Sequence, residues 1–261
     1  MVLEKVKNGM KRVLPTRMFL LYRTLRNVRD FGAVLRFLRN KELPLSRSER
    51  LRMIRRFYAI SFRVDSPHTQ EEILSYVTTL LTLPQTVRGS VVEAGCYKGG
   101  STAKFSLAAK AAHRRLIVFD SFEGLPENVE LHDKNIFNRP ASFKKGDYAG
   151  ALEEVRSNVS TFGRLEVCEF IKGWFDNTMP SFREPLAEIY LDVDLASSTR
   201  TCLKYLYPLL QPGGVLYSQD GHLPLVLEVF DDAKFWENEV GCPKPIVEGL
   251  RTRKLLKIVK L

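Results

Sequence analysis

The sequence predicts an α/β protein with a doubly wound, mostly parallel sheet and an antiparallel last strand. From residue 88 onward, short apolar runs alternate with helical segments, and the final two strand-like runs are separated only by residues 250–253. Several of the runs are too apolar to have a solvent-facing side, which is typical of parallel strands covered on both faces. A connection as short as 250–253 makes a hairpin, so the last strand runs antiparallel.

The order of elements follows from the same alternation. The expected strands are residues 90–94, 116–120, 165–171, 188–193 and 214–218. The expected helices are residues 101–113, 149–162, 198–210 and 225–239. The runs 245–249 and 254–261 form the terminal hairpin and bring the expected sheet to seven strands.

Composition bounds the class of protein. With 261 residues, 44% hydrophobic and 27% charged, the chain can bury a full core, which excludes disordered, collagen-like and disulfide-scaffold classes. No apolar run approaches the roughly 20 residues of a membrane-spanning helix, and residues 1–15 lack the apolar block of a signal peptide. We therefore predict a cytoplasmic protein. The four cysteines include no C-x-x-C pair, which favours buried free thiols over a zinc site or disulfides.

Positive charge is concentrated at the N-terminus. Residues 1–64 carry 17 Lys and Arg against 4 Asp and Glu, whereas residues 65–261 carry 23 against 26. This asymmetry divides the chain into a basic helical extension, residues 1–64, and a main domain, residues 65–261. The part with strand and motif signals is slightly acidic, which argues against a nucleic-acid enzyme.

The extension contains an amphipathic basic helix. Its apolar residues recur at steps of three and four, and arginines occupy the other faces. The apolar stripe is Leu21, Leu25, Val28, Phe31, Leu35 and Leu38, and the arginines are Arg23, Arg26, Arg29, Arg36 and Arg39. We expect the stripe to pack on the main domain or on a second subunit, with the arginines solvated. The alternatives are docking to an anionic membrane and binding an acidic substrate or partner.

Two capping boxes predict the starts of the next helices. Ser46 precedes Glu49 by three residues, and Thr69 precedes Glu72 by the same spacing. In each pair the hydroxyl and the carboxylate satisfy the free N–H groups of a helix N-terminus.

The turn after the first main-domain strand is a candidate cofactor site. Residues 91–102 place an apolar strand, Glu93 and the glycines Gly95, Gly99 and Gly100 before a helix. The spacing is neither G-x-G-x-x-G nor a phosphate-binding P-loop. Glu93 would repel a pyrophosphate but attract the positive groups of S-adenosylmethionine, and Asp120 ends the second strand, where an acid can accept both ribose hydroxyls.

Several segments resemble the TylF/MycF/NovP (macrocin O-methyltransferase type) group of sugar O-methyltransferases. The resemblance rests on residues 91–102, the run Asp-Ser-Phe-Glu-Gly-Leu-Pro at 120–126, and residues 146–148, 171–175 and 178–180. It covers roughly residues 65–261 and implies a class I methyltransferase (Rossmann-like) fold. By this resemblance Asp120 binds the ribose. The methionine end is held by Glu93 and the glycines Gly95, Gly99 and Gly100, and the adenine region by Ser121, Phe122, Gly173 and Trp174. Tyr97 and Ser101, in the same turn, are further candidate cofactor-binding residues.

Acidic residues follow the fourth and fifth expected strands. Asp192 and Asp194 are two residues apart and so face the same side, and Gln219, Asp220 and His222 end the neighbouring strand. Carboxylate and amide oxygens suit magnesium, manganese or calcium. The resemblance implies Asp192 and Asp220 as metal ligands, with Asp194 as the general base. Gln219 stands where the family has a second Asp, which should weaken the metal. His222 is a second base, a substrate contact or a polar surface residue.

These features together predict metal-assisted O-methylation of a vicinal diol on a sugar, in a natural product or glycan, with S-adenosylmethionine and Mg²⁺ as cofactors. A homo-oligomer formed through the N-terminal helices would be compatible. Two other classes stay open. A nucleic-acid methyltransferase would use the basic region, and a catalytically inactive docking protein would result if Gln219 abolished the metal.

Overall fold

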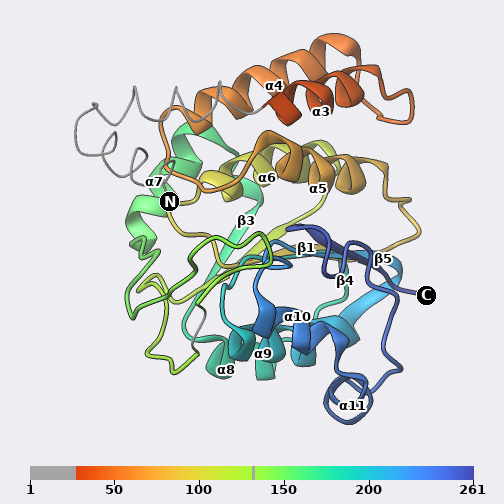
Figure 1. Ribbon diagram of the computed structural model, residues 1–261. Coiled ribbons are helices and arrows are strands. Elements are labelled where there is room, and N and C mark those ends of the chain that lie inside the picture. Colours follow the sequence, from red (N-terminus) through yellow and green to blue (C-terminus); the bar gives the residue numbers. More distant parts are fainter. Residues whose placement is uncertain (1–27, 131–132) are drawn as a thin grey trace.

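A six-stranded sheet forms the centre of the molecule (Figure 1). The computed structural model describes residues 28–130 and 133–261. The strands are β1 (Ser90–Ala94), β2 (Leu116–Asp120), β3 (Cys168–Lys172), β4 (Leu186–Leu191), β5 (Leu210–Ser218) and β6 (Leu256–Val259). Their order is β3-β2-β1-β4-β5-β6, and only β6 pairs antiparallel, against β5.

Helices precede the sheet and connect its strands. The α-helices are α3 (Val28–Arg39), α4 (Arg47–Ser61), α5 (Gln70–Thr82), α6 (Gly100–Ala111), α7 (Leu152–Phe162), α8 (Phe175–Thr178), α9 (Ala196–Leu206), α10 (Pro224–Asp231) and α11 (Ala233–Phe235). Short helical turns are η1 (Leu165–Val167), η2 (Met179–Ser181), η3 (Tyr207–Leu209) and η4 (Trp236–Val240). Within the described ranges, none of these helices has the length and apolar character needed to span a bilayer.

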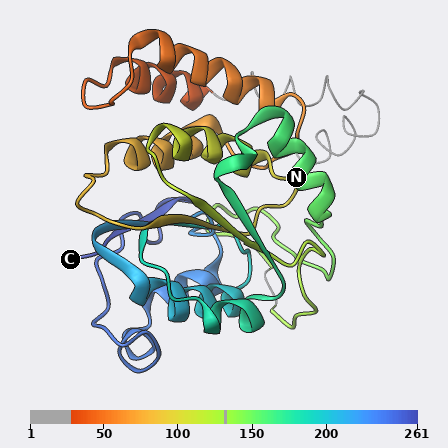
Figure 2. The ribbon, with the colours of Figure 1, turned by 180° about the vertical axis from the view of Figure 1, so that it is seen from behind.

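Helices cover both faces of the sheet in layers. Helices α5, α6 and α7 cover one face, and α8, α9 and α10 cover the other (Figures 1 and 2). Helices α3 and α4 form an additional outer layer over α5 and α6 (Figure 2). Alternate residues of β1 serve the two cores: Val91 belongs to the apolar cluster under α5 and α6, and Val92 to the cluster under α9 and α10.

The parallel part of the sheet confirms the predicted fold class. Strands β1 and β2 have the predicted bounds, because each is a short, mainly apolar run that is followed directly by a turn. The antiparallel last strand is also confirmed. The prediction of a seventh strand was wrong: residues 245–249 contribute a single bridge, between Glu248 and Lys257. Pro243 and Pro245 lack the N–H groups that a longer ladder requires.

Both helix starts that the capping boxes predicted are confirmed, but one predicted helix is divided in two. Both capping boxes form, with Ser46 before α4 and Thr69 before α5. The single helix expected over 225–239 was wrong, because Asp232 interrupts it. The Asp232 side chain accepts a hydrogen bond from the Phe235 N–H and thereby starts a separate short helix.

The apolar stripe predicted for α3 packs on the main domain only in part, since Leu38 lies against the core but Phe31 does not. Phe31 is 68% exposed, whereas Ala33 and Phe37 are buried against the core. The rotation of the helix follows from Asp30, a buried carboxylate that accepts the Glu71 N–H at the start of α5 (3.1 Å). Leu21, Leu25, Arg23 and Arg26 lie outside the described residues, as do the side chains of Val28 and Arg29.

Candidate active site

A cavity of about 340 Å³ opens at the carboxyl ends of the parallel strands. Residues that end or follow β1, β2, β4 and β5 line one side, among them Gly95, Asp120, Asp192 and Asp220. The described parts of the connection between β2 and α7, residues 121–130 and 133–151, contribute much of the remaining wall. The crevice outside the strand ends is the usual ligand site of an open parallel sheet, so the fold places the cavity where the sequence predicted chemistry.

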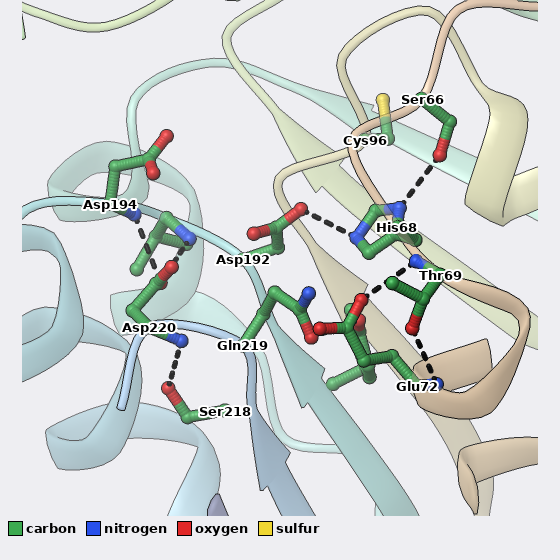
Figure 3. A network of polar contacts seen from close by, with 12 residues as sticks. Ser66, His68, Thr69, Glu72, Cys96, Asp192, Asp194, Ser218, Gln219 and Asp220 are labelled. Atoms are coloured by element: carbon green, nitrogen blue, oxygen red, sulfur yellow. Dashed lines mark hydrogen bonds and ion pairs between the residues drawn. The ribbon is translucent and has the colours of Figure 1, made fainter. Parts of the chain in front are cut away.

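Three carboxylates converge in this cavity. One side-chain oxygen from each of Asp192, Asp194 and Asp220 lies within 4.8 Å of the other two (Figure 3). Asp220 Oδ2 accepts the backbone N–H groups of Val193 (2.9 Å) and Asp194 (3.0 Å). Its other oxygen, Oδ1, is buried and has no hydrogen-bond partner among the residues that the structure describes. A buried carboxylate oxygen without a donor fits a cation ligand, and a set of oxygens suits magnesium or manganese.

Asp194 projects into the cavity from a left-handed backbone position. Its φ is +58°, a conformation in which Asp and Asn are among the few favoured non-glycine residues. Burial, and then the nearby charges of Asp220 and Asp192, raise the pKa of Asp194 well above its usual value. Burial and Asp192 raise the pKa of Asp220 to about 7. The crowded acids therefore hold protons more tightly than isolated carboxyls do.

Asp192 behaves differently because of a histidine that the sequence reasoning missed. His68 Nε2 lies 2.9 Å from Asp192 Oδ2, and Ser66 Oγ lies 2.7 Å from His68 Nδ1 (Figure 3). When neutral His68 donates Nε2–H to Asp192, its Nδ1 accepts the Ser66 hydroxyl proton. Burial acts to raise the pKa of Asp192, but the charge and hydrogen bond of His68, with Lys254, hold this pKa below its usual value.

Lys254 is a second site residue that the sequence analysis did not find. It lines the cavity beside the three acids, and its carbonyl accepts the Gly221 N–H (2.9 Å). Burial opposes its charge, but Glu72, Asp192, Asp220 and Asp194 together raise the pKa of Lys254. Burial and Lys254 lower the pKa of His222, which also lines the cavity, to about 4. His222 is therefore neutral at physiological pH.

Gln219 lies apart from the cavity lining. Its backbone follows β5, and its side-chain carbonyl oxygen accepts the Tyr190 hydroxyl (3.0 Å) in a fully buried position. The amide faces Glu72, whose carboxylate accepts the Thr69 N–H of the α5 capping box (Figure 3). The sequence thus placed Gln219 at the correct strand end, but its side chain belongs to a network between β4, β5 and α5.

The predicted cofactor residues divide into two groups. Those that line the cavity are Gly95, Tyr97, Asp120, Ser121, Gly173 and Trp174. Both Asp120 oxygens accept backbone N–H groups, Oδ2 from Cys96 (2.7 Å) and Oδ1 from Phe122 (2.7 Å). Each carboxylate oxygen has a second lone pair, so Asp120 can fix both turns and still accept a ligand hydroxyl.

The second group lies behind the cavity. Glu93, Gly99, Gly100, Ser101 and Phe122 are not among the lining residues. Glu93 is fully buried, and this burial raises its pKa to about 8 against the opposing effect of the Ser101 and Thr102 hydroxyls. Phe122 is buried at φ +59° and packs near the Phe170 ring. These residues shape the turns that carry the lining residues.

Gly95 is required by the protein backbone itself. Its φ is +82°, and a Cβ there would lie 2.0 Å from the Asp192 carbonyl oxygen. We expect Gly95→Ala to lower the free energy of unfolding by about 3 kcal/mol, from backbone strain and overpacking, and the melting temperature by roughly 9 °C. Gly146 has the same φ, but a Cβ added there would have no atom of the described residues within 4 Å. Gly146→Ala is therefore the matched control, and its free energy of unfolding should fall by only about 1 kcal/mol. If calorimetry finds the same loss of stability in Gly95→Ala and Gly146→Ala, the expected contact between a Cβ at residue 95 and the Asp192 carbonyl oxygen does not destabilise the protein.

The sequence profile of the macrocin O-methyltransferase (TylF) family matches residues 74–246. The chain belongs to this family. It is a TylF-family protein whose three acids and Asp120 lie inside the matched region, whereas Ser66, His68 and Lys254 lie outside it. The resemblance seen in the sequence is thus confirmed.

Among relatives of this TylF-family chain is 8-demethyl-8-(2,3-dimethoxy-α-L-rhamnosyl)-tetracenomycin-C 4′-O-methyltransferase of Streptomyces olivaceus. It is 35% identical over 178 residues, which cover 62% of the chain and 63% of the relative. The demethyldecarbamoylnovobiocin O-methyltransferase of Streptomyces niveus is 33% identical over 141 residues, 51% of the chain and 53% of the relative. The matches thus span less than two thirds of either curated relative.

Solved structures show the same fold. The O-methyltransferase NovP has a TM-score of 0.63 at 20% identity, over 89% of this TylF-family chain and 98% of that chain. The calicheamicin methyltransferase CalS11 has a TM-score of 0.55 at 18% identity, over 88% and 91%. At these identities the likeness supports the α/β fold and leaves the substrate open.

Proposed function

We propose that this protein is an S-adenosylmethionine-dependent O-methyltransferase that methylates a sugar hydroxyl on a natural product or glycan. The observation that carries the proposal is the convergence of Asp192, Asp194 and Asp220 in the same cavity as Asp120. An alcohol is a poor nucleophile at neutral pH, and these groups offer both a cation site and a proton acceptor beside a candidate cofactor site.

The β1 and β2 ends would hold the cofactor. Gly95 and Tyr97 follow β1, and Asp120 ends β2 with free acceptor capacity for ribose hydroxyls. Trp174 lines the cavity and is 37% exposed, so its ring is available to a planar base. Bound S-adenosylmethionine would supply the methyl group to be transferred. The negative charge of the cavity suits its positive sulfonium centre.

Asp192 and Asp220 would hold a divalent cation. Each has a carboxylate oxygen in the cluster, and Asp220 Oδ1 accepts no hydrogen bond from the described part of the chain. A bound Mg²⁺ would supply positive charge that acidifies a substrate hydroxyl. Gln219, the third ligand that the sequence predicted, would have to exchange its contact with the Tyr190 hydroxyl to contribute its oxygen.

Asp194 would act as the general base. Its side chain lines the cavity next to the two proposed ligands, where it can take the proton of the hydroxyl that attacks the methyl carbon. Such attack needs the two reacting atoms about 3 Å apart. Neutral His222 would contact the acceptor or relay the proton. Relatives named for methylating a rhamnosyl group and a novobiocin precursor favour a sugar with neighbouring hydroxyls as acceptor.

Calorimetric titration tests the cofactor assignment. Wild-type protein should bind S-adenosylhomocysteine and not NAD, and Asp120→Ala should weaken this binding at least about tenfold, since it removes a charged hydrogen-bond acceptor. Asp133→Ala, an exposed aspartate in the loop that follows β2, is the control and should bind as wild type does.

A wild-type protein that fails to bind S-adenosylhomocysteine, or an Asp120→Ala variant that binds normally, would overturn the assignment. The acceptor can be sought by adding the protein and methyl-labelled S-adenosylmethionine to a cell extract. Mass spectrometry should then detect a labelled O-methyl sugar, and a chelator should suppress its formation.

A further inference from the structure

The outer layer of α3 and α4 presents a strongly basic face. Between residues 28 and 63 the chain carries ten Lys and Arg against three Asp and Glu. Two of the arginines serve structure: buried Arg50 donates to the backbone carbonyl oxygens of Leu38 and Asn40, and Arg36 pairs with Glu71. Within α3, α4 and the loop between them, the exposed cations without an ion pair to any described residue are Arg39, Lys41, Arg47, Arg52, Arg55 and Arg56.

The same two helices also expose two large apolar side chains. Phe31 is 68% exposed on α3, and Leu51 is 41% exposed on α4. In both helices the opposite side is the buried one, with Phe37 and Phe57 facing α5 and α6. We define Phe31, Leu51 and the six cations listed above as the α3–α4 face. The two helices form the outermost layer on their side of the sheet (Figure 1).

The composition of this face selects among possible occupants. A second copy docked through the same face would bring two clusters of six unpaired cations together, which costs electrostatic energy. A bilayer with anionic lipids instead offers negative headgroups for the arginines and an acyl boundary for Phe31 and Leu51. No described residue of α3 or α4 lines the cavity, so the face is no extension of the substrate site.

We propose that the α3–α4 face docks the protein on anionic membrane surfaces. The arginines bind lipid phosphates, and Phe31 and Leu51 insert at the headgroup boundary. The proposal goes beyond the methyltransferase function and does not depend on it, because docking requires neither cofactor nor turnover. Its consequence is that the protein works at a membrane surface, held there by the outer side of α3 and α4.

Vesicle sedimentation with the full-length protein tests docking. The protein should bind vesicles of phosphatidylcholine with about 30% phosphatidylglycerol at least tenfold more tightly than pure phosphatidylcholine vesicles. High salt should remove this preference. Each basic residue near an anionic surface contributes roughly a factor of five. The triple variant Arg52→Gln/Arg55→Gln/Arg56→Gln should therefore bind about 100-fold more weakly. Phe31→Ser should weaken binding roughly tenfold without changing the salt dependence.

A matched control removes the same charge elsewhere. Lys172, Arg183 and Lys234 are exposed and lie outside α3 and α4, so replacing all three with Gln should leave vesicle binding unchanged. Equal binding to both vesicle types, or equal losses in the two triple variants, would overturn the proposal. So would a dimer in light scattering that Phe31→Ser dissociates, or binding to a 20-base-pair DNA duplex that exceeds vesicle binding and is lost in the Arg52/Arg55/Arg56 variant.

Discussion

Replacing Asp194 with Asn should lower kcat by about 10² to 10⁴, the usual contribution of a positioned proton acceptor. Binding of Mn²⁺ and of S-adenosylhomocysteine should persist, because the proposed ligands Asp192 and Asp220 and the cofactor residue Asp120 are unchanged. Asn is the appropriate substitution at this position, since the backbone φ of +58° favours Asp and Asn over other non-glycine residues. A loss of rate then reports the missing base and not a strained turn.

The pH dependence gives Asp194 a second signature. A base must be ionised to accept a proton, and burial with the charges of Asp220 and Asp192 raises the pKa of Asp194. The wild-type rate should therefore fall as pH decreases, at a higher pH than for an ordinary aspartate. Added Mg²⁺ should move this fall to lower pH, because nearby positive charge favours the ionised carboxylate. The Asn variant should lack this limb and recover part of its rate at high pH.

Asp192→Asn is the comparison variant. It should lose both rate and Mn²⁺ affinity, whereas Asp194→Asn should lose rate alone. Should Asp194→Asn abolish Mn²⁺ binding while Asp192→Asn retains it, the roles of ligand and base would be reversed. Full activity of both variants in the presence of a chelator would remove the cation from the reaction. Stopped-flow or steady-state kinetics combined with manganese titration by electron paramagnetic resonance separate these results.

The strand ends were predictable because local sequence determines them. The apolar run of β1 and that of β2 each end at a turn marked by glycine or an acid, and parallel strands bring these ends to one edge. The same rule placed Asp192, Asp194 and Asp220 together, although Asp220 lies 26 residues beyond Asp194 in the chain. Alternation and spacing were sufficient here, since no distant side chain decides where the strand ends.

The roles of residues away from the strand ends could not be predicted in the same way, because contacts with distant parts of the chain determine them. The side chain of Gln219 turned toward Tyr190 and Glu72 since α5 lies over that end of β5. The rotation of α3 depends on the hydrogen bond that Asp30 accepts from Glu71 at the start of α5, 41 residues away in sequence. Lys254 reaches the acids through the C-terminal hairpin, and no sequence motif marks it.

Of the site residues that the sequence analysis missed, His68 is the one whose replacement we expect to weaken metal binding most. It lies 124 residues before its partner Asp192, in the short connection between α4 and α5. Its side chain is 3% exposed, and its ring lies edge-on to Tyr190 with a centroid separation of 5.8 Å. Two hydrogen bonds, to Ser66 and to Asp192, fix both ring nitrogens. This arrangement orients one oxygen of Asp192 and leaves the other for a ligand.

Replacing His68 with Phe should therefore weaken Mn²⁺ binding about 10- to 100-fold, the usual cost of losing a partner that orients a metal ligand. Phe keeps the aromatic contact with Tyr190, so a general loss of packing does not explain the effect. Saturating Mg²⁺ should restore most of kcat, and Ser66→Ala should show a smaller loss of affinity. Removal of His68 also removes an influence that lowers the pKa of Asp192, so metal binding should shift to higher pH.

His113→Asn provides the control, because this histidine is exposed, remote from the cavity lining, and at a φ of +55° that Asn accepts. It should bind Mn²⁺ as wild type does. Unchanged Mn²⁺ affinity in His68→Phe would mean that Asp192 is oriented without His68, and the cation site would then rest on the backbone N–H groups that fix Asp220. If wild type itself binds no Mn²⁺, the metal assignment fails first, and the histidine would act only in holding residues 62–69 against β4.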